Sequence, residues 1–187
     1  MIRRLKLYIF SGAIVTGCAF FDFQYRDLVL TALLLGLPLL DVRWIQSLSK
    51  QYFQADRLTL ILAFAYAAVV SSHPGHLWHA ISIVVLVALP EEWFYRLWLL
   101  KSLNEKGVSN KALSNALTSA LFAVAHIPTQ GLVGLLTFIP SLVLGCVFQK
   151  TNNLTNTVLL HAIFNLIYFV FLLDLIQLNT DLLFSRK

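Results

Sequence analysis

The sequence predicts an all-α membrane protein, built as a bundle of about seven transmembrane helices (roughly six to eight). Of the 187 residues, 58% are hydrophobic and 12% are charged, and the mean hydropathy is +0.76. Soluble domains have about a quarter of their residues charged. Apolar segments close to membrane-spanning length recur with short polar breaks, and no linker or sequence repeat separates them. We therefore expect one membrane-embedded domain over residues 1–187.

The apolar segments define the expected spans. Each has roughly the length that a membrane helix needs, although the first three are short. We place the spans at residues 6–21, 27–42, 57–72, 77–100, 111–127, 130–149 and 155–175. The N-terminal segment also resembles a signal peptide, with a basic start and small residues. Because further spans follow at once, we interpret it as an uncleaved first span.

The distribution of Lys and Arg predicts the orientation. With the N-terminus in the cytoplasm, eleven of the fourteen basic residues fall on the cytoplasmic side, and only Arg26, Arg186 and Lys187 fall outside. This bias is the positive-inside pattern of integral membrane proteins. We therefore interpret the net charge of +5 as a signal of topology and of contact with anionic headgroups. No basic run interleaved with aromatic residues suggests a nucleic-acid partner.

Five ionisable side chains and one amide lie inside the expected spans, where polar groups are costly and mark functional sites by default. They are Glu91, Glu92, Arg96, His126, His161 and Asn165. Glu92 and Arg96 are four residues apart with the acid first, which is the favourable order for an ion pair on one helix face. This pair could also simply anchor the helix at the membrane interface.

Glu91 differs from its neighbour. It is rotated about 100° away on the helix and has no basic residue one turn further on. Pro90 precedes it, weakens the helix there and can open space beside it. A poorly solvated carboxylate of this kind suits general acid or base catalysis.

Aromatic residues suggest the depth of the glutamates. Trp93, Tyr95 and Trp98 follow them, and such residues often lie at the headgroup level. We therefore expect Glu91 just below the cytoplasmic interface. Straight spans would put His126 at the opposite end of its own span, so it reaches Glu91 only if that span is displaced, long or tilted.

Two further motifs place histidines on other spans. "FAVAH" ends the fifth span with Phe122 and His126 four residues apart, and "HAIFN" in the seventh puts His161 and Asn165 on one helix face. Each alone could be a polar contact between helices. If they converge with Glu91, they form a hydrolytic centre, in which Glu91 activates a water and His126 positions it or passes its proton. His161 and Asn165 could then donate to the developing oxyanion.

A metal site is the rival chemistry. Two histidines and a glutamate make a sensible zinc set, and spacing does not decide because the groups come from three helices instead of one. A second candidate is "HPGHLWH", in which His73, His76 and His79 could hold a surface metal or form a polar loop without function. Cys18 and Cys146 lie inside apolar segments, so we expect neither a disulfide framework nor a thiolate metal site.

In this order and spacing, the motifs resemble those of a known family. "EEWFYR" fits EExxxR, "FAVAH" fits FxxxH and "HAIFN" fits HxxxN, on successive apolar helices. The chain is similar to the CPBP intramembrane endopeptidases, also called the Abi or CAAX-protease and bacteriocin-processing family, which include the type II CAAX prenyl endopeptidase. The similarity covers a core at residues 77–173, just over half of the chain.

The resemblance implies an active-site cavity open toward the cytoplasmic side and peptide-bond hydrolysis by a glutamic-type mechanism without a cofactor. The catalytic positions correspond here to Glu91, His126, His161 and Asn165, with Glu92 and Arg96 as structural support. In that mechanism the glutamate activates water and the last two groups stabilise the oxyanion. The alternatives are a zinc-dependent version of the same hydrolysis, and a non-enzymatic immunity, transport or scaffold protein with the same fold.

The resemblance leaves the substrate open among prenylated tails, bacteriocin leaders, peptide pheromones and C-terminal sorting signals. Because we see no added recognition module, we expect the substrate to be a membrane-associated peptide or a lipidated or anchored protein. The compact size of the chain favours an enzyme of the bacterial inner (plasma) membrane.

Overall fold

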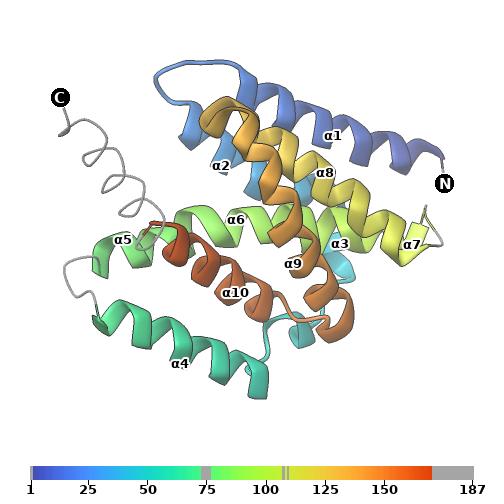
Figure 1. Cartoon of the computed structure of the whole chain (residues 1–187). Helices are drawn as coiled ribbons and strands as arrows, with labels where there is room; N and C mark the ends of the chain where they lie inside the picture. The colour runs from blue at the N-terminus through green and yellow to red at the C-terminus, as the bar shows by residue number, and fades with distance from the viewer. Residues whose placement is uncertain (1, 73–76, 107, 109, 170–187) are drawn as a thin grey trace, which may run out of the picture.

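The computed structural model describes residues 2–72, 77–106, 108 and 110–169, and its regular elements within them are all helical (Figure 1). Seven helical stretches coincide with the seven expected spans, which confirms the all-α prediction. They are α1 (Ile2–Phe20), α2 (Arg26–Gly36), α4 (Arg57–Ser72), a central helix at residues 77–106, α8 (Lys111–Gln130), α9 (Phe138–Thr151) and α10 (Leu154–Ile167). The shorter connecting elements are η1 (Leu37–Leu40), α3 (Val42–Gln46), η2 (Lys50–Phe53) and η6 (Gly131–Thr137).

Not every helical stretch is long enough to cross a membrane by itself. Among the described residues, the stretches that are long and apolar enough are Lys50–Ser72, Leu77–Glu105 and Lys111–Thr151. The last contains α8, η6 and α9, with Gly131 at a positive φ of 64° between them. Leu7–Phe20 and Leu154–Ile167 are apolar but shorter. The final expected span, 155–175, ends outside the described residues, as does the C-terminal tail.

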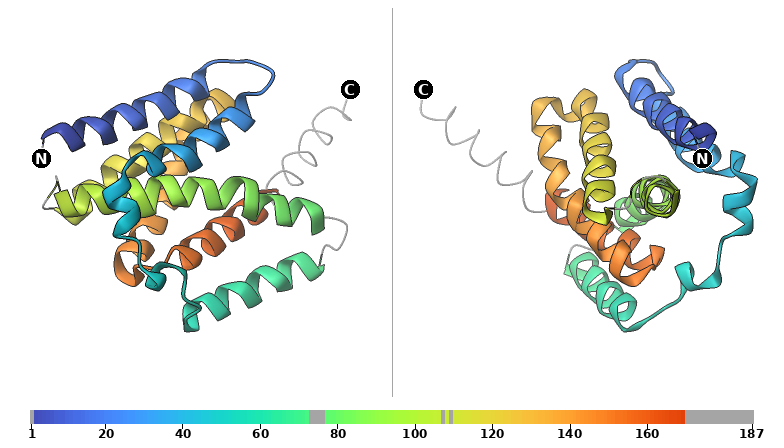
Figure 2. Two further views of the ribbon diagram at one scale, coloured as in Figure 1. Left: turned by 180° about the vertical axis from the view of Figure 1, so that it is seen from behind. Right: turned by 90° about the vertical axis from the view of Figure 1, so that its right-hand side faces the viewer.

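The central helix forms the core of the bundle. It contacts α2, α8, α9 and α10, and the right-hand view of Figure 2 shows it end-on with the other helices arranged around it. Phe94, Leu97, Trp98 and Leu100 on this helix have no exposed surface. The helix that carries both glutamates is therefore held from several sides.

The aromatic residues that follow the glutamates pack inside the bundle. Trp98 is fully buried and lies edge-on to Tyr8, with 5.1 Å between the ring centroids, and Tyr95 packs on Phe122 at the same distance. Their burial lends no support to the interpretation of these residues as a belt at the headgroup level, and their depth in the membrane stays a prediction. Glu91 lies halfway along the central helix.

The central helix continues through Pro90 by means of two π-helical segments. These are η4 (Ile83–Ala88) and η5 (Trp93–Leu100), on either side of the α-helical turn α6 (Leu89–Glu92). The two ends of the helix are α5 (Leu77–Ser82) and α7 (Lys101–Lys106). Proline has no N–H, and its ring crowds the carbonyl group four residues earlier. A π turn is wider, and the N–H of Leu89 bonds a carbonyl group five residues back. The two glutamates thus lie in one α-helical turn between two wider segments.

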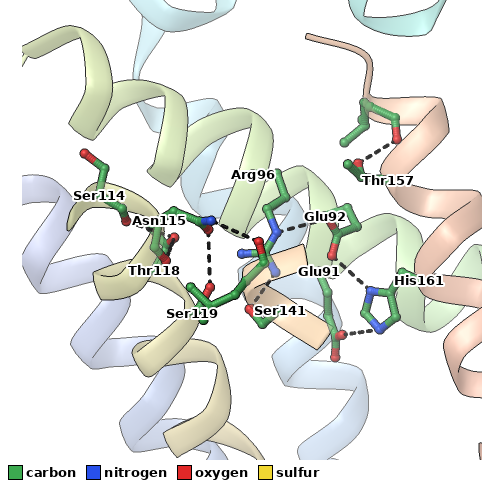
Figure 3. A network of polar contacts seen from close by, with 12 residues as sticks. Glu91, Glu92, Arg96, Ser114, Asn115, Thr118, Ser119, Ser141, Thr157 and His161 are labelled. Atoms are coloured by element: carbon green, nitrogen blue, oxygen red, sulfur yellow. Dashed lines mark hydrogen bonds and ion pairs between the residues drawn. The ribbon is translucent and has the colours of Figure 1, made fainter. Parts of the chain in front are cut away.

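Small and polar side chains bring α8 and α9 together. Asn115 on α8 donates from Nδ2 to the Leu142 carbonyl group at 2.9 Å, and Ser119 donates to Asn115 Oδ1 at 3.4 Å. A Cβ atom on Gly145 of α9 would overlap the Asn115 amide. Close approach through small residues is a common source of helix association in lipid. The crossing brings Ser141 of α9 up to the central helix (Figure 3).

A polar cluster fixes the start of α10 against the start of α4. The Asp56 carboxylate caps α4 by accepting a hydrogen bond from the Thr59 N–H at 2.8 Å. The same carboxylate accepts from the side-chain amides of Asn153 at 3.1 Å and Asn156 at 2.9 Å, and Asn153 also caps α10. His161 lies about two turns further along α10, so this cluster helps to set its position in the bundle.

We predict that Gly145→Ala lowers the free energy of unfolding by about 1–3 kcal/mol, because the new methyl group must displace the buried Asn115 side chain. Gly17→Ala on α1 is the matched control, since no atom lies within 4 Å of a Cβ built there. That control should be neutral or stabilising by up to about 1 kcal/mol. Thermal unfolding in detergent micelles measures both, and equal midpoints for the two variants would contradict the close crossing of α8 and α9.

Candidate active site

Glu92 and Arg96 form a buried ion pair on the central helix. The distance from Arg96 Nε to Glu92 Oε2 is 3.2 Å, and neither side chain has exposed surface. The predicted pair at spacing four is thereby confirmed. Arg96 also donates from Nη2 to Ser141 Oγ on α9 at 2.7 Å (Figure 3). The pair therefore connects the central helix to a second helix.

His161 of α10 lies between the two glutamates. Its Nδ1 is 3.0 Å from Glu92 Oε1, and its Nε2 is 3.5 Å from Glu91 Oε2. Carboxylates only accept hydrogen bonds, so a protonated imidazole with an N–H on each nitrogen satisfies both. The charges of Glu91, Glu92, His161 and Arg96 then sum to zero, as a poorly solvated site requires. Glu91 has no basic partner on its own helix, but it has one on α10.

The two glutamates differ in their surroundings. The Glu92 side chain is fully buried, whereas 17% of the Glu91 side chain is exposed. Glu91 Oε2 makes no well-formed hydrogen bond in the described part of the chain, and its contact with His161 is an ion pair at 3.5 Å. Glu91 is thus the carboxylate that a small molecule can reach.

Glu91 and His126 line the same cavity. It has a volume of about 450 Å³, and Tyr95 and several apolar side chains of α1, α2 and η4 complete its wall. The two motifs converge on this cavity, and α8 (Lys111–Gln130) extends beyond the expected span 111–127 and runs obliquely to the central helix (Figure 1). His126 Nδ1 is 2.9 Å from the Phe122 carbonyl oxygen; if Nδ1 carries the proton, Nε2 is an acceptor.

The Phe122 ring packs the three motifs together. Its centroid lies 4.4 Å from that of His126 and 5.8 Å from that of His161. The Arg96 guanidinium carbon lies 5.5 Å from the same centroid, a distance at which a cation is attracted by an aromatic ring. The phenylalanine of "FAVAH" therefore helps to hold the residues around it at fixed separations.

Asn165 and His79 stand apart from these contacts. Asn165 is half-buried one turn beyond His161, with no hydrogen bond from its side chain to the other site residues among those described. His79 is exposed and packs edge-on to Phe169 at 4.8 Å. His73 and His76 lie outside the described residues.

A metal site is the rival interpretation of these residues. Both nitrogens of His161 face carboxylates. In the part of the chain that the structure describes, no three His, Cys, Asp or Glu side chains gather as metal ligands. The nitrogen and oxygen atoms that could bind a metal contact one another instead of surrounding a shared position.

The cavity wall includes residues that the sequence did not single out. Asp27 and Leu28 at the start of α2 and Leu86 on η4 are among its exposed members. These residues form no recognisable motif in the sequence. Asp27 in particular is not conspicuous, because an acidic residue is common in the first turn of a helix. Their place near the α1–α2 turn, next to Arg26, lends no support to a cytoplasmic opening, which stays a prediction.

Ser141 was also missed. It is a lone serine in an apolar segment, 45 positions from Arg96 in the chain. Ser141 and Gly145 have the spacing of two small residues at a helix crossing in lipid. That spacing could have indicated the close approach of α9, but not the contact with arginine.

A family model described as type II CAAX prenyl endopeptidase Rce1-like matches residues 72–167, just over half of the chain. The chain belongs to this family. No curated protein and no solved structure matches it. The matched region contains the central helix, α8, α9 and α10 and therefore all three motifs. As an Rce1-like protein with apolar helices of spanning length, the chain is an integral membrane protein and, in general terms, a CAAX-type intramembrane endopeptidase.

We predict that Glu92→Leu lowers the free energy of unfolding by about 3–5 kcal/mol, because it leaves Arg96 buried without its counter-charge. Glu105→Leu is the matched control. Glu105 and Lys101 also pair at spacing four and 3.2 Å on this helix, but Glu105 is 48% exposed. The control should cost no more than about 1 kcal/mol. Denaturation followed by tryptophan fluorescence measures both, and similar losses would show that burial does not distinguish the two pairs.

Proposed function

We propose that the protein is a glutamic-type intramembrane endopeptidase, which cleaves a membrane-associated peptide or protein tail with water activated by Glu91. One observation carries the proposal. Glu91 is the partly exposed carboxylate of the site and faces the cavity that His126 also lines, while its other neighbour is His161. A carboxylate base (Glu91), the imidazole of His126 and space for the bond to be cleaved thus occur in one cavity.

In the proposed first step, Glu91 accepts a proton from a water in the cavity and the hydroxide attacks the carbonyl carbon of the substrate. His126 on the facing wall orients that water. Its Nδ1 contact with the Phe122 carbonyl group leaves Nε2 available for this purpose. A positioned base of this kind typically contributes about 10²–10⁴-fold to a rate.

The negative oxygen formed by this attack needs donors. We assign the role to His161 Nε2–H and to the Asn165 side-chain amide, which lie one turn apart on α10. The 3.5 Å ion pair with Glu91 is long, so the N–H can also donate to a substrate oxygen placed beside that carboxylate. The proton on Glu91 then passes to the leaving amine as the peptide bond breaks, which returns the carboxylate.

Glu92 and Arg96 have a supporting role in this proposal. Glu92 contacts His161 Nδ1 and so fixes the orientation of the ring. Arg96 balances the second carboxylate. Both are fully buried and do not line the cavity, so they act through His161 instead of touching the substrate.

We propose that the reaction uses no metal or other cofactor. The contacts of His161 with two carboxylates, and an amide at the fourth catalytic position, suit hydrogen-bond donation better than zinc ligation. The zinc-dependent version remains the alternative and has its own test below.

The substrate and location follow from the setting of the site. Apolar side chains of α1, α2 and η4 form half of the cavity lining, which suits an apolar segment or a lipidated tail within the bilayer. We propose a bacterial inner (plasma) membrane protein with a cytoplasmic N-terminus and no nucleic-acid partner. A non-enzymatic immunity, transport or scaffold role would predict partner binding or flux without cleavage.

We predict that Glu91→Gln lowers hydrolysis by at least about 10²-fold, since the amide cannot accept a proton from water. Cleavage of a quenched fluorescent farnesylated CAAX-type peptide, and of membrane peptides co-expressed with the protein and read by mass spectrometry, measures this loss. Glu105→Gln, at an exposed position on the same helix, should keep the wild-type rate. Undiminished processing by folded Glu91→Gln protein would rule out the proposed base.

We predict that exhaustive chelation leaves the rate within about twofold of the untreated enzyme, because no step of the proposed mechanism needs a Lewis acid. The assay follows treatment of the detergent-solubilised protein with EDTA and 1,10-phenanthroline, with zinc content measured on the same sample. A loss of activity that stoichiometric zinc restores would establish the metal-dependent version.

A further inference from the structure

Ser141 makes a hydrogen bond that the proposed mechanism does not yet explain. Its hydroxyl accepts from Arg96 Nη2 at 2.7 Å, and the residue has no exposed surface. Within the described residues, Arg96 Nε and Nη1 make no well-formed hydrogen bond. Ser141 is therefore the one hydrogen-bond partner of this guanidinium in the described part of the chain, although Arg96 also has the charge of Glu92 nearby.

This contact orients the guanidinium. Attraction to Glu92 through Nε constrains one edge of the group, and the Phe122 ring at 5.5 Å constrains one face. Neither fixes the direction of the Nη atoms as a short hydrogen bond does, because charge attraction and cation–π contacts depend weakly on angle. Ser141 supplies that direction from a different helix.

The contacts continue from Ser141 to the proposed base. Arg96 lies against Glu92 Oε2, and Glu92 Oε1 lies 3.0 Å from His161 Nδ1. His161 Nε2 then faces Glu91. Figure 3 shows this series of side chains crossing from α9 through the central helix to α10. A displacement at Ser141 reaches Glu91 through three charged groups, with little water available to screen them.

We propose that Ser141 is a positioning residue for the proposed hydrolysis, which acts through Arg96 and Glu92 to hold His161 against Glu91. This proposal rests on the function proposed above. It extends the site to α9, which carries none of the three sequence motifs.

The α8–α9 crossing explains why a serine serves here. The close approach at Gly145 leaves room only for small side chains on this face of α9. The other polar groups of the crossing are already engaged, since Asn115 bonds the Leu142 carbonyl group and Ser119 bonds Asn115. Serine combines a small volume with an acceptor oxygen, so it meets both requirements.

The test uses variants at Ser141 in the full-length protein, with the farnesylated CAAX-type peptide as the probe. Ser141→Ala removes the acceptor, and Ser141→Cys keeps the size but accepts weakly. Both should lower kcat about tenfold while KM stays within about twofold. Ser141→Thr keeps the hydroxyl and should retain most of the activity. Ser119→Ala is the matched control, because Ser119 is equally buried at the same crossing and contacts Asn115 instead of Arg96.

A double-mutant cycle separates positioning from general damage. Arg96→Lys shortens the cation, so that it no longer reaches Ser141. If Ser141 acts through Arg96, then Ser141→Ala should have little further effect on kcat in the Arg96→Lys protein. Additive losses would contradict the proposed route.

A measurement without turnover keeps this proposal apart from the proposed function. Ring ¹H–¹⁵N spectra of protein labelled with ¹⁵N-histidine report the hydrogen bonds of His161, which His161→Gln assigns. Ser141→Ala and Ser141→Cys should shift the His161 signals, whereas Ser141→Thr and Ser119→Ala should leave them in place. Unchanged His161 signals in Ser141→Cys would overturn the proposal, even if the wild type cleaves no probe. If Ser141→Ala does not fold, the comparison of Cys with Thr at this position decides.

Discussion

The fold depends on keeping Glu92 and Arg96 together in apolar surroundings. Two charges without exposed surface are tolerated only while each remains paired. The pair lies on one helix, yet Arg96 reaches α9 through Ser141, and Glu92 reaches α10 through His161. Separating α10 leaves the two carboxylates without His161, and separating α9 leaves Arg96 Nη2 without its acceptor. The same contacts that would serve hydrolysis therefore also select one packing of the bundle.

Polar contacts supply the specificity that apolar packing lacks in this protein. In lipid, helices gain little by burying one apolar face against another, so small residues and hydrogen bonds decide which faces meet. The α8–α9 crossing at Asn115 and Gly145 is one such place, and the cluster around Asp56 at the start of α10 is another. Each fixes one helix that carries a residue of the site, and the two helices meet around Phe122.

Local features were predictable from the sequence, and contacts between helices mostly were not. The seven helical stretches follow from the length of the apolar segments, and the Glu92–Arg96 pair follows from helical spacing. Both can be recognised within a single segment of the sequence. The scarcity of ionisable groups in apolar spans suggested that Glu91 and His126 meet, but the sequence left open whether His126 could reach the cavity that both line. The position of His161 between two carboxylates and the role of Ser141 depend on how α9 and α10 cross the central helix. Aromatic residues do not decide depth by themselves, because packing in the core draws on the same residue types as the headgroup region.

The π-helical segments around the glutamates couple the length of the chain to the local helix geometry. A π turn holds an extra residue compared with an α turn. Losing one residue from the last turn of η5 would allow that segment to close into regular α-helix. Because each remaining residue would then turn further about the helix axis, everything beyond it, including the connection to α8, would keep nearly its present direction relative to Glu91. Relatives that keep this site can therefore lose one residue between Trp93 and Leu100, provided that the segment changes from π-helix to α-helix.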